Sequence, residues 1–246
     1  MENNKVRTNF LVSFQNLQEP TDEIIERIDI LDLKNPSLGS IGAWKISNIK
    51  KAISLYKSKV KISATLGDIF CNQEFIKNIE KFDCLNLDFI KFGLLSKSLD
   101  NLFQKIDIIS LRKFKTDLVC VVFVDKKGHL ELVSNNLELL NTNGIDFLLL
   151  DTFKKNECNL LSYCNFTVLK NFIFECKRYG IHVGLAGRLN ENHLPSLIPF
   201  QPNVIGFRSA VCSSNKRDSL IDRDKVYRLS SFFKVRSINA TERAGA

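Results

Sequence analysis

The chain has 246 residues, of which 44% are hydrophobic and 25% charged, enough material for one large core in an ordinary globular protein. The formal net charge is +8, which raises the question of nucleic acid as a partner. Lysine and arginine are spread in short groups without a basic tail or a nucleic-acid motif. We therefore expect no nucleic-acid binding, and favour a solvated basic surface or a site for phosphorylated metabolites.

Short apolar runs of strand length follow one another from residue 9 onward. The first eight residues are polar, and no stretch has the length of a signal peptide or a membrane span, so we expect a cytoplasmic protein without membrane contact. Eight strands are predicted, at Asn9–Ser13, Ile28–Lys34, Val60–Leu66, Leu85–Gly93, Asp117–Val124, Ile145–Asp151, Ile181–Gly187 and Val204–Arg208.

Patterns of helical period lie between these runs. Two apolar stripes at this spacing are Ile46, Ile49, Ile53 and Tyr56, and then Leu169, Phe172, Ile173 and Cys176, the second ending at Gly180. Eight strand–helix units favour a single (βα)8 barrel of the TIM type over residues 1–246, with a polar segment at 1–8 and a frayed tail at 240–246. No Gly-x-Gly-x-x-Gly follows the first strand, which weakens a dinucleotide-binding alternative.

The sequence indicates neither a set of metal ligands nor a disulfide framework. The seven cysteines contain no Cys-x-x-Cys pair and are odd in number, and the three histidines have no ligand spacing. We therefore predict no metal and no cofactor. His129 follows Lys127 and Gly128 in a predicted turn and is expected to face solvent.

Three lysines lie where apolar runs end. Lys34 closes one run, Lys91 lies inside another, and Lys155 follows Asp151 by four residues. A single lysine there is most simply explained by an ammonium group that reaches solvent. Three of them, with Asp32 and Asp151 nearby, indicate amine chemistry, because crowded or buried lysines have lowered pKa values and release a neutral amine that attacks carbonyl groups.

The barrel hypothesis brings these residues together, because chemistry in such folds gathers at the carboxyl ends of the strands. Side chains alternate along a strand, so Asp32 and Lys34 face the same way. We expect both to meet Lys91, Asp151 and Lys155 at one mouth.

The last two predicted strands end in small residues beside arginines, in the position where such barrels hold a phosphate group. We therefore expect Gly187, Arg188, Arg208 and Ser209 to bind the phosphate of a small phosphorylated substrate. A homo-oligomer stays open as a further association.

A series of motifs in fixed order resembles one known family. The motifs are Asp32-Leu33-Lys34-Asn35-Pro36, Gly39-Ser40-Ile41-Gly42, Ser63-Ala64-Thr65-Leu66-Gly67-Asp68, Ile90-Lys91-Phe92-Gly93-Leu94, Asp151-Thr152 with Lys155, Leu185-Ala186-Gly187, and Gly206-Phe207-Arg208 with Cys212. Together they resemble the (5-formylfuran-3-yl)methyl phosphate synthase family over most of the chain. The resemblance implies a barrel enzyme of methanofuran biosynthesis, a lyase that condenses two molecules of glyceraldehyde 3-phosphate into a furan aldehyde phosphate with loss of phosphate and water.

Carried over position by position, the resemblance implies that Lys34 forms a Schiff base and that Lys91 accepts a proton. Asp32, Asp151 and Lys155 match the supporting positions.

Three departures from the family pattern lie near the predicted mouth. Arg188 stands where the family usually has serine, Ser209 where it has glycine, and residues 156–157 where it has Asp-Gly. Two alternatives therefore stay open. One is a class I aldolase-type lyase for another phosphorylated carbonyl compound, and the other is a barrel that binds a phosphorylated ligand without turnover, with Lys34 and Lys91 in structural ion pairs.

Overall fold

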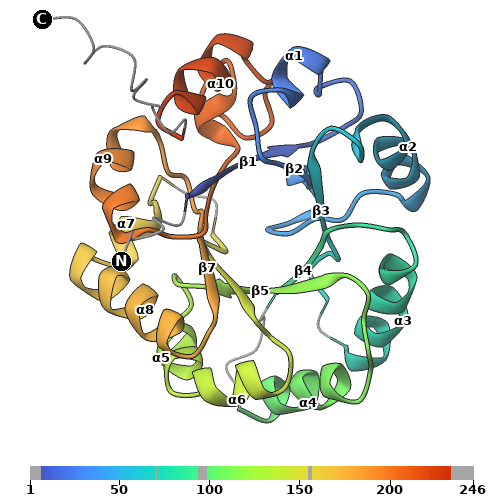
Figure 1. Ribbon diagram of the computed structural model, residues 1–246, viewed down its shortest axis with the longest axis vertical. Helices are drawn as coiled ribbons and strands as arrows, with labels where there is room; N and C mark the ends of the chain where they lie inside the picture. Colours follow the sequence, from blue (N-terminus) through green and yellow to red (C-terminus); the bar gives the residue numbers. More distant parts are fainter. Residues whose placement is uncertain (1–6, 70, 94–98, 155–156, 234–246) are drawn as a thin grey trace, which may run out of the picture.

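Eight parallel strands close into a ring, and the helices surround it on the outside (Figure 1). The computed structural model describes residues 7–69, 71–93, 99–154 and 157–233. The strands are β1 (Asn9–Phe14), β2 (Ile30–Leu33), β3 (Lys61–Thr65), β4 (Phe89–Gly93), β5 (Asp117–Phe123), β6 (Phe147–Asp151), β7 (His182–Leu185) and β8 (Val204–Phe207). The predicted (βα)8 barrel is confirmed. The frayed tail at 240–246 and most of the polar segment at 1–8 lie outside the described residues.

Each strand pairs in parallel with its neighbour in sequence, and β8 pairs with β1 to close the ring. The strands are apolar along most of their length because barrel and helices cover both faces. Every predicted strand overlaps an observed one, although the observed strands are often shorter. The prediction for β4 began too early because Leu85 lies in the turn that ends the preceding helix, where Asn86 takes a positive φ of 61°.

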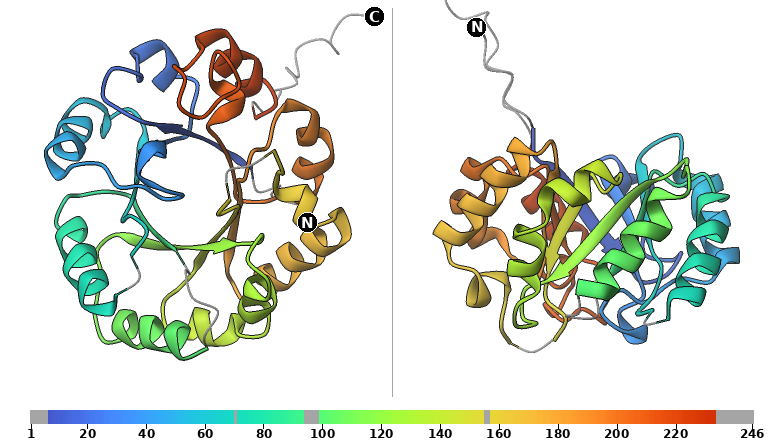
Figure 2. Two further views of the ribbon diagram at one scale, coloured as in Figure 1. Left: turned by 180° about the vertical axis from the view of Figure 1, so that it is seen from behind. Right: turned by 90° about the horizontal axis from the view of Figure 1, so that it is seen from below.

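The helices pack their apolar stripes against the barrel. The α-helices are α1 (Asp22–Ile25), α2 (Ile46–Tyr56), α3 (Asn72–Asp83), α4 (Leu99–Ser110), α5 (His129–Ser134), α6 (Leu137–Thr142), α7 (Leu160–Tyr163), α8 (Phe166–Arg178), α9 (Leu194–Leu197) and α10 (Arg223–Ser230), and the 3₁₀ turns are η1 (Pro36–Leu38), η2 (Glu191–His193), η3 (Ile198–Phe200) and η4 (Ser209–Val211). Figure 2 shows this outer layer from behind and from below. No helix in the described part of the chain has the length and apolar character to cross a membrane.

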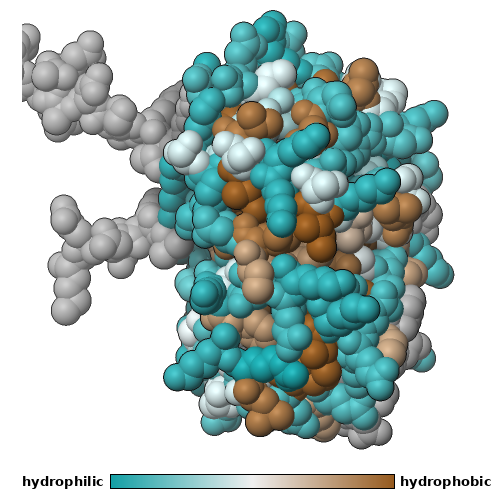
Figure 3. All heavy atoms as spheres, turned by 90° about the vertical axis from the view of Figure 1, so that its right-hand side faces the viewer, coloured by the Kyte–Doolittle hydropathy of each residue, from teal (hydrophilic) through white to brown (hydrophobic). Residues whose placement is uncertain are grey.

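Helix α8 illustrates how local signals set these elements. Asn165 caps its first turn by accepting a hydrogen bond from the backbone N–H of Val168, and Gly180, at a φ of 72°, follows its last turn. The predicted stripe of four residues is its buried face. On the outside, Figure 3 shows the side of the molecule that carries α2 and α3, where hydrophilic side chains dominate and apolar ones form a broken band.

The expectation for His129 is wrong. The residue begins helix α5, which starts after Gly128 at a φ of 83°, and only 1% of His129 is exposed. The turn was placed correctly, but the helix that follows it directs the imidazole into the protein.

Candidate active site

A cavity of about 560 Å³ opens among residues that end or follow the strands. Its lining includes Asp32 from β2, Lys34 just after β2, Lys91 from β4 and Asp151 from β6. The structure therefore brings together four of the five residues predicted to carry amine chemistry. The fifth, Lys155, lies outside the described residues.

Lys91 and Asp32 form a buried ion pair at the base of the cavity. Lys91 Nζ lies 2.5 Å from Asp32 Oδ1, and the two side chains are 4% and 0% exposed. Ser13 Oγ donates a hydrogen bond of 2.7 Å to Asp32 Oδ2. Burial lowers the pKa of Lys91 because it removes water from the ammonium group; Asp32 opposes this effect and Lys34 adds to it. The protein environment therefore favours the neutral amine of Lys91 more than water does.

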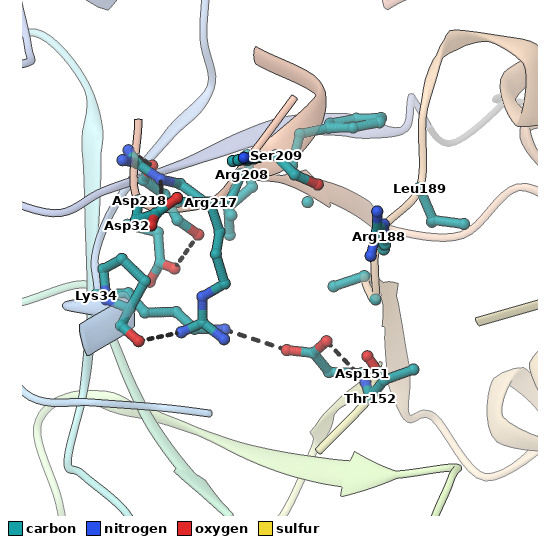
Figure 4. A pocket seen from close by; sticks show the side chains of 18 of the residues that line it. Asp32, Lys34, Asp151, Thr152, Arg188, Leu189, Arg208, Ser209, Arg217 and Asp218 are labelled. Atoms are coloured by element: carbon teal, nitrogen blue, oxygen red, sulfur yellow. Dashed lines mark hydrogen bonds and ion pairs between the residues drawn. The ribbon is translucent and has the colours of Figure 1, made fainter. Parts of the chain in front are cut away.

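The Lys34 side chain crosses the mouth of the cavity from the end of β2 to the end of β6. Its backbone N–H donates to Phe14 O at 3.1 Å, which continues the β1–β2 pairing, and its Nζ reaches Asp151 Oδ2 at 3.2 Å. Asp151 lies on β6, on the opposite side of the eight-stranded ring, and its Oδ1 accepts from the backbone N–H of Thr152 at 2.7 Å. The amine is therefore directed into the cavity, in contact with a carboxylate (Figure 4).

The loop after β7 has an unusual backbone. Gly187 and Arg188 both have positive φ angles, 91° and 56°. A Cβ at Gly187 would lie 3.2 Å from Thr152 Cγ2, so the close approach of the two loops also favours glycine. The Arg188 guanidinium forms an ion pair with Glu157 at 2.9 Å, and both side chains are exposed at the rim.

Arg208, at the end of β8, lines the cavity, but its guanidinium is bound by the protein. Nη1 and Nη2 donate to the two carboxylate oxygens of Glu19 at 2.7 and 2.8 Å. Further hydrogen bonds run to the carbonyls of Ser13 (3.1 Å), Arg217 (2.7 Å) and Ser219 (3.0 Å). Phosphate binding by Arg208 and by Ser209, the first residue of η4, stays a prediction. The Glu19 side chain is 1% exposed, so this pair joins the loops after β1 and β8.

Arg217 was missed by the sequence analysis. It lies in the loop between Cys212 and α10, a segment without periodic pattern, and nothing in the sequence distinguished it from other loop arginines. Its side chain enters the cavity beside Lys34 and Asp151 (Figure 4). Nη2 donates to the carbonyls of Pro36 at 2.6 Å and Gly39 at 2.8 Å. The loop after β8 is thereby joined to the loop after β2.

Known proteins are similar to this chain over most of its length. A family model described as 4-HFC-P synthase matches residues 10–230. The (5-formylfuran-3-yl)methyl phosphate synthase of Methanocaldococcus jannaschii is 28% identical, over 91% of this chain and 99% of its own. The synthase of the same name from Archaeoglobus fulgidus is also 28% identical, over 89% and 96%.

Among solved structures, phosphoribosyl anthranilate isomerase from Thermus thermophilus has a TM-score of 0.60 and 11% identity, over 92% of this chain and 98% of that one. At that identity the likeness concerns the barrel fold alone.

Proposed function

Because the chain belongs to the 4-HFC-P synthase family, and is an enzyme, we propose that it condenses two molecules of glyceraldehyde 3-phosphate into (5-formylfuran-3-yl)methyl phosphate for methanofuran biosynthesis. The observation that carries this proposal is the pairing of two lysines with two carboxylates in one cavity, Lys34 with Asp151 and Lys91 with Asp32. Such a set supplies an amine nucleophile and a separate proton acceptor.

The reaction begins at Lys34. Its neutral amine attacks the carbonyl carbon of one triose phosphate, and loss of water gives an imine. Asp151, at 3.2 Å from Nζ, takes up and returns the protons that this step moves. The protonated imine withdraws electrons and acidifies the neighbouring carbon.

Lys91 then removes the proton from that carbon. Burial favours its neutral form before the transfer, and Asp32, 2.5 Å away, stabilises the ammonium group afterwards. The resulting enamine attacks the aldehyde of the second triose phosphate. Ring closure, hydrolysis of the imine and loss of one phosphate and two water molecules overall balance the atoms of the furan product.

A second candidate is a class I aldolase-type lyase for another phosphorylated carbonyl compound. The specific observation that favours it is the Arg188–Glu157 ion pair at the rim, made by residues that depart from the family pattern. Both candidates use an imine on Lys34, so trapping does not separate them. Mass spectrometry of the product from glyceraldehyde 3-phosphate does, because only the synthase yields a six-carbon furan aldehyde.

Reduction with borohydride during turnover tests the role of each lysine. With glyceraldehyde 3-phosphate we expect a covalent adduct on the peptide that contains Lys34, and its loss in Lys34→Ala. Lys91→Ala should keep the adduct and lose furan absorbance by at least about 100-fold, the range of general-base catalysis. The measurements are peptide mass spectrometry and ultraviolet absorbance.

A matched control is Lys57→Ala, which removes a half-buried lysine paired with Asp88 at 2.6 Å, outside the cavity. It should keep both adduct and product. An adduct that persists in Lys34→Ala would contradict the proposed chemistry.

A further inference from the structure

We infer that Arg217 recognises a phosphate group of the substrate, and that Arg208 contributes by positioning the loop that carries Arg217. The inference rests on the proposed function for the identity of the substrate. It assigns phosphate recognition to Arg217 in place of Arg208, the residue that follows β8.

The first argument is the balance of charge in the cavity. Among the described residues that line it, four cations are buried or half-buried. Three are matched by carboxylates: Lys34 by Asp151, Lys91 by Asp32 and Arg208 by Glu19. The remaining one is Arg217, and no ion pair joins it to a carboxylate in the described part of the chain.

The second argument is the direction of the Arg217 donors. Both of its hydrogen bonds leave from Nη2 and end on the neutral carbonyls of Pro36 and Gly39. Within the described residues, Nε and Nη1 have no acceptor at hydrogen-bonding distance. Withdrawal from water lowers the pKa of the Arg217 guanidinium, and Asp151 partly offsets this, yet a guanidinium stays charged at neutral pH. A half-buried cation with donors to spare is a binding position for an anion.

The third argument is how the position is built. Arg208 donates hydrogen bonds to the carbonyls of Arg217 and Ser219, and these bonds hold the loop that carries Arg217 in place. Glu19 and Ser13 O anchor Arg208 to the segment that ends β1. The guanidinium of Arg208 is therefore occupied, whereas Arg217 extends into the cavity beside Lys34 and Asp151 (Figure 4).

Phosphate is the anion that fits this position. A phosphate monoester carries close to two negative charges at neutral pH and accepts several hydrogen bonds, which suits a guanidinium. Asp151 and Asp32 already balance Lys34 and Lys91, and the exposed carboxylates of Glu157 and Asp218 also line the cavity, so an incoming dianion needs an additional cation. Lys154 and Lys216 also line the cavity but are exposed, whereas Arg217 is half-buried and fixed by hydrogen bonds.

The test compares Arg217→Ala with Arg112→Ala. Arg112 is a matched control, because it too donates to a backbone carbonyl, and its ion pair with Glu80 lies away from the cavity. We expect Arg217→Ala to raise, by about 10- to 100-fold, the glyceraldehyde 3-phosphate concentration that gives half-maximal borohydride-trapped adduct. The concentration for glyceraldehyde, which lacks the phosphate, should change less than about threefold. Arg112→Ala should change neither.

Equal losses with both aldehydes would overturn the inference, because a general disturbance of the site does not discriminate a phosphate. Titration calorimetry with inorganic phosphate separates this result from a failure of the proposed function. If the unaltered protein makes no furan and no adduct, weaker phosphate binding in Arg217→Ala still supports the anion site, and unchanged binding refutes it.

A further pair of variants tests the positioning role of Arg208. Arg208→Lys should weaken inorganic phosphate binding in the unaltered background, because a lysine cannot reproduce hydrogen bonds to Glu19 and three carbonyls together. In the Arg217→Ala background the same substitution should have no further effect on phosphate binding. An independent loss in both backgrounds would show that Arg208 itself contacts phosphate, and would overturn this part of the inference.

Discussion

Lys91 lies where a charged ammonium group is energetically costly. Its side chain is 4% exposed, and the water that would solvate it is replaced by the barrel interior and by Asp32 at 2.5 Å. Burial lowers the pKa of Lys91, and Asp32 raises it again in part. Asp32 is therefore the neighbouring charge that most strongly favours the protonated form of Lys91.

Substitution of that carboxylate should shift the pH dependence of the reaction. Asp32→Asn removes the charge that raises the pKa of Lys91, so the amine stays neutral to lower pH. If Lys91 is the proposed proton acceptor, the ascending limb of log kcat/KM against pH reports its deprotonation and is expected to move to more acidic pH. Activity at the plateau should fall as well, because the ammonium group formed during turnover loses its partner. A limb that moves to higher pH, or a control Asp88→Asn that moves it equally, would contradict this assignment.

At this scale the sequence predicts well where a residue is chemically out of place. Lys34 and Lys91 were found because strand ends and interiors rarely hold lysine, and Asp32 because it alternates with Lys34. Arg217 and Glu19 could not be found in this way. An arginine or a glutamate in a loop is ordinary in sequence, and only the folded chain shows that Glu19 meets Arg208, 189 positions away.

Among the elements, the loops after β1, β2 and β8 are joined by arginines. Arg208 binds Glu19 and the carbonyl of Ser13, while Arg217 binds the carbonyls of the β2 loop. With Glu19 1% exposed, the loss of Arg208 would leave a buried carboxylate without its cation.

We expect Arg208→Leu to lower the free energy of unfolding by about 3–5 kcal/mol, as for other broken buried ion pairs. The double variant Glu19→Leu with Arg208→Leu should lose less than the sum of the two single variants, since the stranded charge is removed. Urea denaturation followed by circular dichroism measures both effects. The control Arg178→Leu removes an exposed pair with Glu175 and should cost less than about 1 kcal/mol. If the loss of stability in the double variant equals the sum of the losses in the two single variants, Glu19 and Arg208 are not energetically coupled.

The predicted elements agree best where the pattern is regular. The predicted stripe of α8 is the buried face of that helix. In α2, Ile49 and Tyr56 are buried, whereas Ile46 and Ile53 are partly buried and pack against the core. A 3.6-residue period leaves little choice of which side packs inward. No apolar stripe was predicted for α5 and α6, two short helices separated at Asn135 and Asn136.

At the scale of the whole molecule, the ring closes where β1, the first strand, pairs with β8, the last one. Phe10, on the outer face of β1, stacks on Phe233 at 4.8 Å between ring centroids and meets Phe207 of β8 edge-on at 5.6 Å. These aromatic rings cover the seam on the outside, and Phe233 is 5% exposed.

Removal of the Phe233 ring should therefore weaken the entire barrel. We expect Phe233→Ala to lower the free energy of unfolding by about 3–5 kcal/mol, the usual cost of emptying a buried phenylalanine site. The neighbouring Phe232 is 39% exposed, so Phe232→Ala is a close control and should cost much less. Thermal unfolding of both variants is the measurement. Equal losses would show that the seam is not held by the ring stack.

Eight strand–helix units indicated a closed ring, and the structure has one. The alternation of strands and helices alone would also suit an open, doubly wound sheet, so the number of units decided the prediction. The contacts that seal the ring were beyond the sequence, because Phe10 and Phe233 lie at opposite ends of the chain.

The hydrogen bonds of Arg208 to its loop end on main-chain carbonyls, which every amino acid provides. The side chains at positions 217 and 219 can therefore change in the course of evolution without loss of these hydrogen bonds from Arg208. New preferences for the group bound at the mouth can arise by exchanging one residue in this loop, while the barrel and its two lysine–aspartate pairs stay as they are.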